Sequence, residues 1–263
     1  MNSLNIFCVT DKPHKHLEAL NVNLVGVGKR QFNYKYTTCM NGKNIQNKEK
    51  HYSELTFHYW FWKNKLKNYR NNDWIGFCQK RRFWLNEKNH TNHNNILDII
   101  LKNTPDKWKN YEAVICEPIY LGTKLSKLLK RGWKNIIDKP SLLFNHKEIS
   151  IKIQFDMHHG YDVLDRAIDV MDKKDRNDFR TFVHTKNFYN PHIMFISKKK
   201  ILNKFFQEQF DWLTKCEKIF GFNKLNDYGL KRIYGFLAER FLSYWFTKNY
   251  KFKELPIIFK NLS

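Results

Sequence analysis

The chain has 263 residues, of which 42% are hydrophobic and 16% aromatic, and its formal net charge is +22. This length can bury a large hydrophobic core, and the apolar content excludes a disordered polymer. The charge favours an anionic partner: nucleic acid, an acidic membrane face or a phosphorylated substrate. Lysines interspersed with asparagines along the whole chain also fit a compositional habit of the source organism, so the charge alone does not select a partner.

The five cysteines are Cys8, Cys39, Cys78, Cys116 and Cys216, and most of them lie in apolar runs without any Cys-x-x-Cys pair. Such cysteines behave as small core residues in a reducing compartment, which argues against a disulfide framework and against a zinc knuckle. The N-terminus lacks the pattern of a signal peptide, and no apolar run approaches the ~20 residues that span a bilayer. We therefore expect a cytoplasmic protein, with room for peripheral contact with the inner membrane face.

The first half of the chain alternates short apolar runs with helical or polar segments. We predict strands over 4–9 and 23–28, a polar loop over 33–50, a helix over 51–66 and a strand over 74–78. The helix is indicated by Leu55, Tyr59, Trp62 and Leu66, which recur at helical spacing.

Polar and cationic residues follow the strand predicted over 74–78: Gln79, Lys80, Arg81 and Arg82. In open α/β sheets, ligands bind outside the carboxyl ends of the strands. A cationic cluster at such an end is placed to meet an anionic ligand, so we expect the chemistry of the protein there.

The second half is more helical. We predict a helical run over 96–101, a strand over 111–118, a helix over 163–171, a strand over 193–196 and helices over 201–220 and 230–246. Lysines at helical spacing in 121–148 are typical of a solvated helix, or of one that rests on acidic lipid headgroups. No repeat or flexible linker divides the chain, so we predict a single α/β domain over 1–263 with a helical C-terminal part.

Short motifs spread over nearly the whole chain suggest one protein family. They are Val9-Thr10-Asp11-Lys12-Pro13, Asn44-Ile45, Tyr52-Ser53-Glu54-Leu55-Thr56, Tyr59-Trp60-Phe61-Trp62-Lys63-Asn64, Trp74-Ile75-Gly76-Phe77-Cys78, Arg81-Arg82-Phe83, Gln154-Phe155 with His159, Met194-Phe195-Ile196, and Arg232 with Gly235-Phe236-Leu237-Ala238-Glu239-Arg240. Together they resemble the capsular-polysaccharide and lipopolysaccharide locus proteins grouped as domain of unknown function 4422. These are glycosyltransferase-like proteins, some associated with galactofuranosyl transfer.

The chain departs from the family's usual pattern at a few positions. Gln79 and Lys80 replace a His-Tyr pair, Phe155 replaces a Tyr, and Ile193 replaces an Asn. These replacements leave open a changed donor or an inactive transferase-like scaffold.

The resemblance implies a GT-A-like fold, in which a nucleotide-sugar-binding mixed sheet is flanked by helices. It places the nucleotide-binding half in 1–120 and the half for the acceptor and the catalytic base in 150–263. The implied reaction moves a hexosyl unit, with galactofuranosyl as one candidate, from a UDP-sugar to a surface-polysaccharide or lipid-linked glycan acceptor. We expect an inverting mechanism, with retention as the alternative.

Many GT-A enzymes hold a divalent metal with an Asp-x-Asp after a central strand, and none follows Cys78. Lys80, Arg81 and Arg82 stand in the comparable place, where fixed cations neutralise a leaving diphosphate. We therefore predict no metal ligands, while leaving a manganese or magnesium ion open as a cofactor. The further predicted donor contacts are Thr10, Asp11, Asn44 and Arg232.

Glu239 is the first candidate for the catalytic base, and Asp162 with nearby His159 is the second. A carboxylate in an apolar helix has its pKa raised by desolvation unless a cation such as Arg240 or Arg232 offsets it. The competing interpretation is structural, with Glu239 paired to an arginine inside a helical core.

A rival function from another class is nucleic-acid binding, which the charge of +22 and the many aromatic residues suggest. Against it, the lysines are spread along the chain and no known nucleic-acid-binding motif is present.

Overall fold

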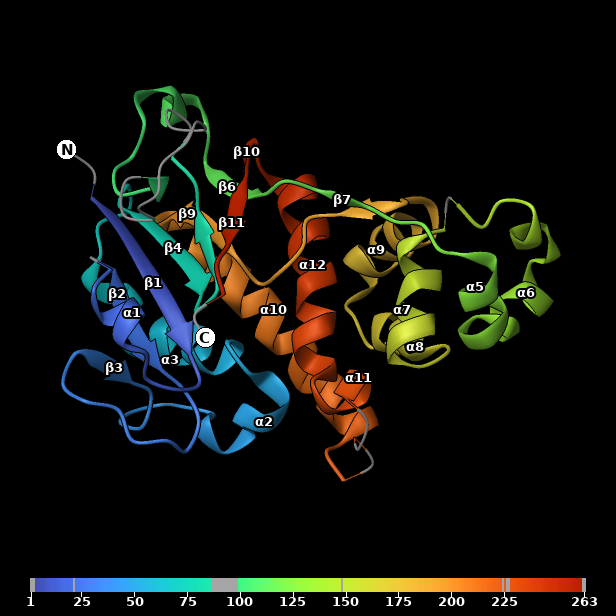
Figure 1. The fold of residues 1–263 in the computed structure, drawn as a ribbon, viewed down its shortest axis with the longest axis horizontal. Helices are drawn as coiled ribbons and strands as arrows, with labels where there is room; N and C mark the ends of the chain where they lie inside the picture. Colours follow the sequence, from blue (N-terminus) through green and yellow to red (C-terminus); the bar gives the residue numbers. More distant parts are fainter. Residues whose placement is uncertain are drawn as a thin grey trace. The chain divides into compact units, whose positions relative to one another are not determined.

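Figure 1 shows the computed structural model, which describes residues 3–20, 22–86, 99–147, 149–223, 225 and 228–261. The chain forms two compact units. Unit 1 comprises Met1–Glu117, His192–Glu208 and Trp245–Ser263, and unit 2 comprises Pro118–Pro191 and Gln209–Tyr244. The chain therefore leaves unit 1 and returns to it twice. The predicted single domain with its two functional halves stays a prediction.

A nine-stranded mixed sheet forms the centre of unit 1 among the described residues. Its strands are β1 (Leu4–Thr10), β2 (Asn23–Gly26), β3 (Tyr36–Thr38), β4 (Trp74–Gln79), β5 (Arg82–Trp84), β6 (Ala113–Cys116), β9 (Phe195–Lys198), β10 (Phe252–Leu255) and β11 (Ile257–Phe259). The order along the sheet is β10-β6-β9-β4-β1-β2-β3, and β5 pairs with both β4 and β11. The predicted mixed α/β class is thereby confirmed.

The strand directions define one edge of this sheet. β1 runs parallel to β2 and to β4, with Thr10 level with Gly26 and Val9 level with Gln79. β9 runs antiparallel to both β4 and β6, so its first residues lie where β4 and β6 end. We call this the carboxyl edge, because β1, β2, β4 and β6 all end there.

Aromatic side chains fill one face of the sheet. Phe77 of β4 contacts Phe57 and Phe61 of helix α3 (Leu55–Asn64), with ring centroids 6.0 and 5.6 Å apart. Phe206, from the first part of helix α10 (Lys199–Phe220), lies 6.0 Å from the same ring. The other face carries a separate cluster that includes Ile6 and Cys8 of β1 and Trp74, the first residue of β4. Successive side chains of a strand point to opposite faces of the sheet, so the same strands contribute to two cores.

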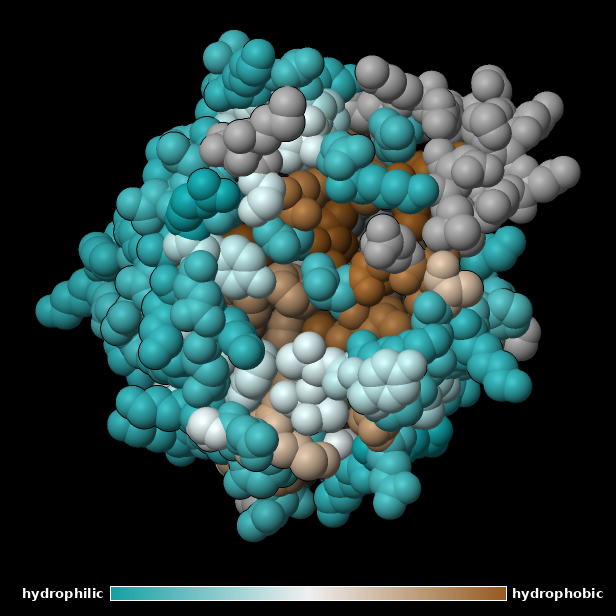
Figure 2. Space-filling view, turned by 90° about the vertical axis from the view of Figure 1, so that its left-hand side faces the viewer, coloured by the Kyte–Doolittle hydropathy of each residue, from teal (hydrophilic) through white to brown (hydrophobic). Residues whose placement is uncertain are grey.

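The side of unit 1 that carries β1 and β2 is mostly polar at its surface (Figure 2). Figure 2 looks onto the side on which β1 and β2 lie in Figure 1, and it shows hydrophobic residues gathered in a hollow among hydrophilic ones. Several hydrophobic side chains packed against the second core are only partly buried, namely Leu4, Val22, Phe32, Ile257 and Ile258. This core therefore reaches the surface in places.

The helix predicted over 51–66 is not continuous. It begins as α2 (Glu49–Tyr52), is interrupted at Ser53, whose φ is 52°, and resumes as α3. Of the helical run predicted over 96–101, residues 96–98 lie outside the described residues, and Ile100 forms an isolated bridge with Leu85. Further short elements in the described part of unit 1 are α1 (Lys15–Glu18), η1 (Gln46–Lys48), η2 (Leu66–Asn68) and η3 (Asp106–Asn110).

Unit 2 is largely helical. Its elements are β7 (Ile119–Tyr120), α5 (Leu125–Arg131), α6 (Trp133–Asp138), η4 (Pro140–Leu143), α7 (Ile151–His159), α8 (Val163–Asp169), α9 (Lys173–Thr185), β8 (Phe188–Tyr189), α11 (Tyr228–Lys231), and parts of α10 and of α12 (Ile233–Asn249). The Ser150 hydroxyl accepts a hydrogen bond from the Ile153 N–H at 3.3 Å and caps α7. Gly160, with φ of 102°, ends α7.

The late predictions hold with small shifts. The strand predicted over 193–196 is displaced to 195–198, and the helices predicted over 201–220 and 230–246 are α10 and α12. All five cysteines are free and buried, which confirms their interpretation as core residues. Within the described ranges, we find no helix with the length and apolar character needed to cross a membrane.

Candidate functional site

Three of the four cationic residues predicted to bind the donor, Lys80, Arg81 and Arg82, lie in a β-hairpin at the carboxyl edge of unit 1. β4 ends at Gln79, which pairs with Arg82 of β5, so that Lys80 and Arg81 make the turn between them. The Lys80 N–H donates a hydrogen bond to the Val9 carbonyl at 3.1 Å, which fixes the turn to the end of β1. The prediction that these cations follow a buried strand is therefore confirmed.

Asp11, the residue after β1, forms an ion pair with Lys80. Partial burial raises the pKa of Asp11, but the hydrogen bond and charge of Lys80, together with the charge of Arg30, lower it overall. The Asp11 side chain is 52% exposed and that of Lys80 is 23% exposed. Both side chains therefore keep contact with solvent at this edge, and the structure brings these two predicted residues together.

β11 and the residue after it contact the same hairpin. The guanidinium groups of Arg81 and Arg82 lie 5.7 and 5.5 Å from the centre of the Phe259 ring on β11. The Lys260 N–H donates a hydrogen bond to the Arg81 carbonyl at 2.9 Å. These contacts orient both guanidinium groups through cation–π attraction. Their partners lie far from them in the sequence.

His192 is a further residue of the carboxyl edge. It precedes β9, has a left-handed backbone with φ of 67°, and lies near Arg82. Burial, with the charge of Arg82, lowers the pKa of His192 to about 4. The imidazole is therefore neutral at pH 7 and lies near the Arg82 cation. A left-handed conformation at a residue other than glycine is costly and recurs at functional sites.

Thr10 and Asn44, predicted as donor contacts, shape the loops around this edge. The Thr10 hydroxyl donates to the Lys12 carbonyl at 2.6 Å and accepts from the Lys12 N–H at 3.2 Å. The Asn44 amide donates to the Met40 and Gly42 carbonyls at 3.0 and 2.9 Å. These bonds use much of the hydrogen-bonding capacity of both side chains. Their contact with a donor stays a prediction.

In unit 2, Glu239 of α12 forms an ion pair with its neighbour Arg240. The Arg240 side chain is 1% exposed, donates to the Gln154 Oε1 at 2.8 Å and lies 4.3 Å from the centre of the Tyr189 ring. The structural interpretation of Glu239, a carboxylate paired with an arginine in a helical core, therefore describes the observed geometry. The role of Glu239 as a base stays a prediction.

His159, the partner predicted for Asp162, is buried in unit 2. Its Nδ1 lies 3.1 Å from the Gly229 carbonyl, which only accepts, so Nδ1 carries the proton. The ring stacks on Phe236 at 4.0 Å between centroids. Burial, with the charge of Arg240, lowers the pKa of His159 to about 3. This histidine is therefore neutral at pH 7 and a weak base.

Asp162 and Arg232 also belong to unit 2. Asp162 has a left-handed backbone with φ of 66°, and its N–H donates to the Asp156 Oδ1 at 3.1 Å. Arg232 is half-buried and lies between α11 and α12. Sequence reasoning grouped Arg232 with the donor contacts of the N-terminal half. Arg232 belongs to unit 2 and those residues belong to unit 1, and its contact with a donor stays a prediction.

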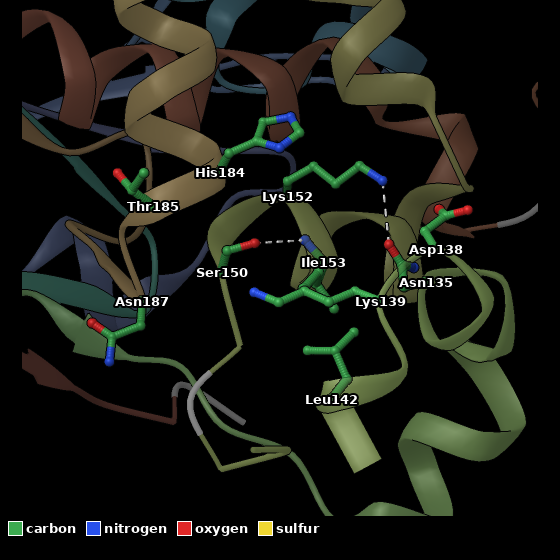
Figure 3. A pocket seen from close by; sticks show the side chains of 10 residues that line it. All are labelled: Asn135, Asp138, Lys139, Leu142, Ser150, Lys152, Ile153, His184, Thr185 and Asn187. Atoms are coloured by element: carbon green, nitrogen blue, oxygen red, sulfur yellow. Dashed lines mark hydrogen bonds between the residues drawn. The ribbon is translucent and has the colours of Figure 1, made fainter. Parts of the chain in front are cut away.

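A pocket of about 560 Å³ in unit 2 was not predicted from the sequence. Figure 3 shows its lining, which consists of Asn135, Asp138, Lys139, Leu142, Ser150, Lys152, Ile153, His184, Thr185 and Asn187. Amide, hydroxyl and charged groups dominate this lining, with Leu142 and Ile153 as its apolar part. Such a mixture is suited to a polar ligand with several hydroxyl groups.

Two lining residues of this pocket, Lys152 and His184, pair with carboxylates. Lys152 Nζ lies 2.7 Å from Asp156 Oδ2. It also donates to Asn135 Oδ1 at 3.2 Å, as Figure 3 shows. His184 Nε2 lies 2.8 Å from Asp165 Oδ1. Burial raises the pKa of Asp156 above its ordinary value even though Lys152 acts to lower it. The side chains of Lys152 and Asp156 are only 12% and 1% exposed, so this ion pair is strongly desolvated.

Among the residues that the structure describes, no group of three or more His, Cys, Asp or Glu is arranged to hold a metal ion. The diphosphate site held by cationic side chains without a metal stays a prediction.

The family description "Domain of unknown function (DUF4422)" matches the chain over residues 5–250. The chain belongs to this family. A solved structure described as the apo form of the bifunctional glycosyltransferase WbbM shares the fold of this DUF4422 chain, with a TM-score of 0.67 and 18% sequence identity. The alignment covers 98% of this chain and 45% of that one, so the DUF4422 chain spans less than half of the WbbM chain. No curated protein matches the chain.

Proposed function

We propose that this DUF4422 chain is a glycosyltransferase whose donor is a UDP-sugar bound at the carboxyl edge of unit 1. The observation that carries the proposal is the turn of Lys80, Arg81 and Arg82, which stands beside Asp11 where the parallel strands β1 and β4 end. In α/β sheets this edge is the usual place for nucleotide ligands. The fold shared with a structure described as a bifunctional glycosyltransferase supports the same class of reaction.

In the proposed reaction, the bond between the sugar C1 and the diphosphate oxygen breaks while a bond forms between C1 and an acceptor hydroxyl oxygen. The electron pair of the broken bond leaves with the diphosphate, so negative charge grows there. Arg81 and Arg82 offer planar groups that match phosphate oxygens, and Lys80 adds a compact charge. These cations stabilise the leaving group as its charge develops.

For the acceptor, we propose a surface-polysaccharide or lipid-linked glycan and a hexosyl transfer with inversion. The hydroxyl- and amide-rich pocket of unit 2 supports a sugar ligand in that unit. Glu239 remains the first proposed base, and it would have to exchange its contact with Arg240 for one with the acceptor hydroxyl. Asp162 is the second. The proposed location is the cytoplasm, where nucleotide sugars are supplied.

Calorimetric titration with UDP tests the donor site, with EDTA and separately with added manganese. Arg81→Ala removes one cation of the turn. Arg70→Ala is a matched control, because Arg70 precedes β4 at the opposite edge and its side chain is 81% exposed. We expect UDP binding that survives EDTA, is weakened about tenfold or more by Arg81→Ala and is unchanged by Arg70→Ala. Absence of UDP binding under every condition would sink the proposal.

A further inference from the structure

Helices α5 and α6 and the turn after them expose large apolar side chains. The exposed fractions are 38% for Leu125, 52% for Leu129, 52% for Trp133, 68% for Ile137 and 86% for Phe144. Leu125 and Leu129 are four residues apart on α5, as are Trp133 and Ile137 on α6, so each pair lies on one side of its helix. Exposed apolar groups gathered on one segment mark an interaction surface more often than single ones do.

The same segment is strongly basic. Its cationic residues are Lys124, Lys127, Lys130, Arg131, Lys134, Lys139 and Lys147, all of which are exposed. Between Lys124 and Lys147, Asp138 is the only acidic residue in the sequence, and it accepts a hydrogen bond from the Tyr161 hydroxyl. Positive charge thus accompanies the exposed apolar groups.

We propose that this segment, residues 124–147, is a docking surface for a bilayer that contains anionic phospholipids. We call it the α5–α6 surface. Short helices with apolar residues on one side and lysines around them lie in the plane of the membrane interface. Lysine side chains reach headgroup phosphates while their methylene stems stay in apolar surroundings, and tryptophan prefers the interface.

The observations favour lipid over nucleic acid as the partner. Single-stranded nucleic acid is held by cations together with aromatic platforms on which bases stack. On the α5–α6 surface, Leu125, Leu129 and Ile137 are aliphatic and gain little from bases, whereas they gain from insertion among acyl chains. Asn135, Asp138 and Lys139 of the same segment line the pocket of unit 2. If the proposed function holds, docking brings that pocket to a lipid-linked acceptor.

Vesicle sedimentation tests the surface without any transferase assay. The full chain is mixed with vesicles of phosphatidylcholine alone or of phosphatidylcholine with phosphatidylglycerol. We expect binding only to the anionic vesicles. Lys127→Gln, Lys130→Gln and Lys134→Gln combined should weaken it by about fivefold per lysine, about a hundredfold in all.

Two further variants separate this surface from general charge. Ile137→Ser with Phe144→Ser removes exposed apolar groups and should weaken vesicle binding about tenfold. The matched control combines Lys67→Gln, Lys107→Gln and Lys109→Gln, three exposed lysines of unit 1, and should leave binding nearly unchanged. Unchanged far-ultraviolet circular dichroism checks that each variant is folded.

Tryptophan fluorescence gives an independent readout, since a blue shift on anionic vesicles that disappears in Trp133→Phe places this residue in the interface. Three outcomes would overturn the proposal. The first is that the chain does not bind anionic vesicles. The second is that the unit 1 control variant loses as much vesicle binding as the lysine variant of the α5–α6 surface. The third is that the Ile137 and Phe144 changes leave vesicle binding unaltered while single-stranded RNA displaces the vesicles. The last outcome would assign the surface to nucleic acid. UDP binding in the lysine variant shows separately whether the donor site is intact.

Discussion

Replacing Arg240 by Met should destabilise unit 2 strongly, because Arg240 is the centre of a buried polar contact. Its guanidinium donates to Gln154 Oε1 at 2.8 Å and pairs with Glu239, whose side chain is 13% exposed. Removing one member of a buried ion pair costs about 3–5 kcal/mol, since the other charge is left without its partner. The lost hydrogen bond to Gln154 is charge-assisted and belongs to the same effect, so the two do not add in full.

We therefore expect Arg240→Met to lower the free energy of unfolding by about 3–5 kcal/mol. The methionine is flexible and fills most of the vacated space, which limits the contribution of a cavity. Urea unfolding followed by circular dichroism at pH 7 measures the change.

Glu239→Gln is the matched variant, because the amide oxygen still accepts from Arg240 while the charge is lost. It should cost less, about 1–3 kcal/mol. A loss below about 1 kcal/mol for Arg240→Met would refute the reasoning, since it would mean that the pair is not formed in the folded protein. In that case the contact with Arg240 would not oppose the role of Glu239 as the proposed base.

Three further changes test other parts of the structure. His58 is buried beside Phe77, neither of its ring nitrogens has a hydrogen-bond partner among the described residues, and burial lowers its pKa to about 3. The unfolded chain then binds more protons than the folded one, so the stability of the folded protein falls as pH drops from about 6.5 towards about 3. The variant His58→Leu should therefore raise the urea midpoint of unfolding, and by more at pH 5 than at pH 8. Gly229→Ala should destabilise the folded protein by about 1–3 kcal/mol in thermal unfolding, because a Cβ at this position would lie 2.1 Å from the His158 carbonyl oxygen. A variant as stable as the wild type would contradict that close approach. Because the pKa of Asp11 is lowered in the folded protein, its ion pair with Lys80 is fully formed above the ordinary carboxyl pKa and is lost as pH falls through the pKa of Asp11 in the folded state. Nuclear magnetic resonance titration should therefore show that the pKa of Asp11 rises in Lys80→Ala.

The strands at the centre of unit 1 were predictable because a buried strand consists of consecutive apolar residues, which the sequence shows directly. The runs over 4–9 and 74–78 coincide with β1 and β4, whose pairing places Lys80 beside the end of β1. The break at Ser53 was not predicted, because the helical spacing of Leu55, Tyr59, Trp62 and Leu66 begins only after it and does not fix where the helix starts. A left-handed backbone at a serine is set by the tertiary structure and not by local propensity.

The parts of the candidate site that sequence reasoning missed depend on partners distant in the chain. Phe259 contacts Arg81 and Arg82 only because β11 pairs with β5. The three residues 257–259 are too few for a strand to be predicted from their sequence. His192 lies at the carboxyl edge because β9 runs antiparallel to β4, a direction that no local pattern specifies. A histidine after Asn-Pro at the start of an apolar run was the only available signal.

Hydrogen–deuterium exchange of the full chain with and without UDP locates the donor most directly. If the diphosphate lies at the carboxyl edge of unit 1, UDP should slow exchange in peptides that cover residues 9–14, 79–84 and 257–260, and should leave Arg70–Asp73, at the opposite edge, unchanged. Slowed exchange confined to other segments, with those three unaffected, would contradict the placement of the donor beside Lys80, Arg81 and Arg82.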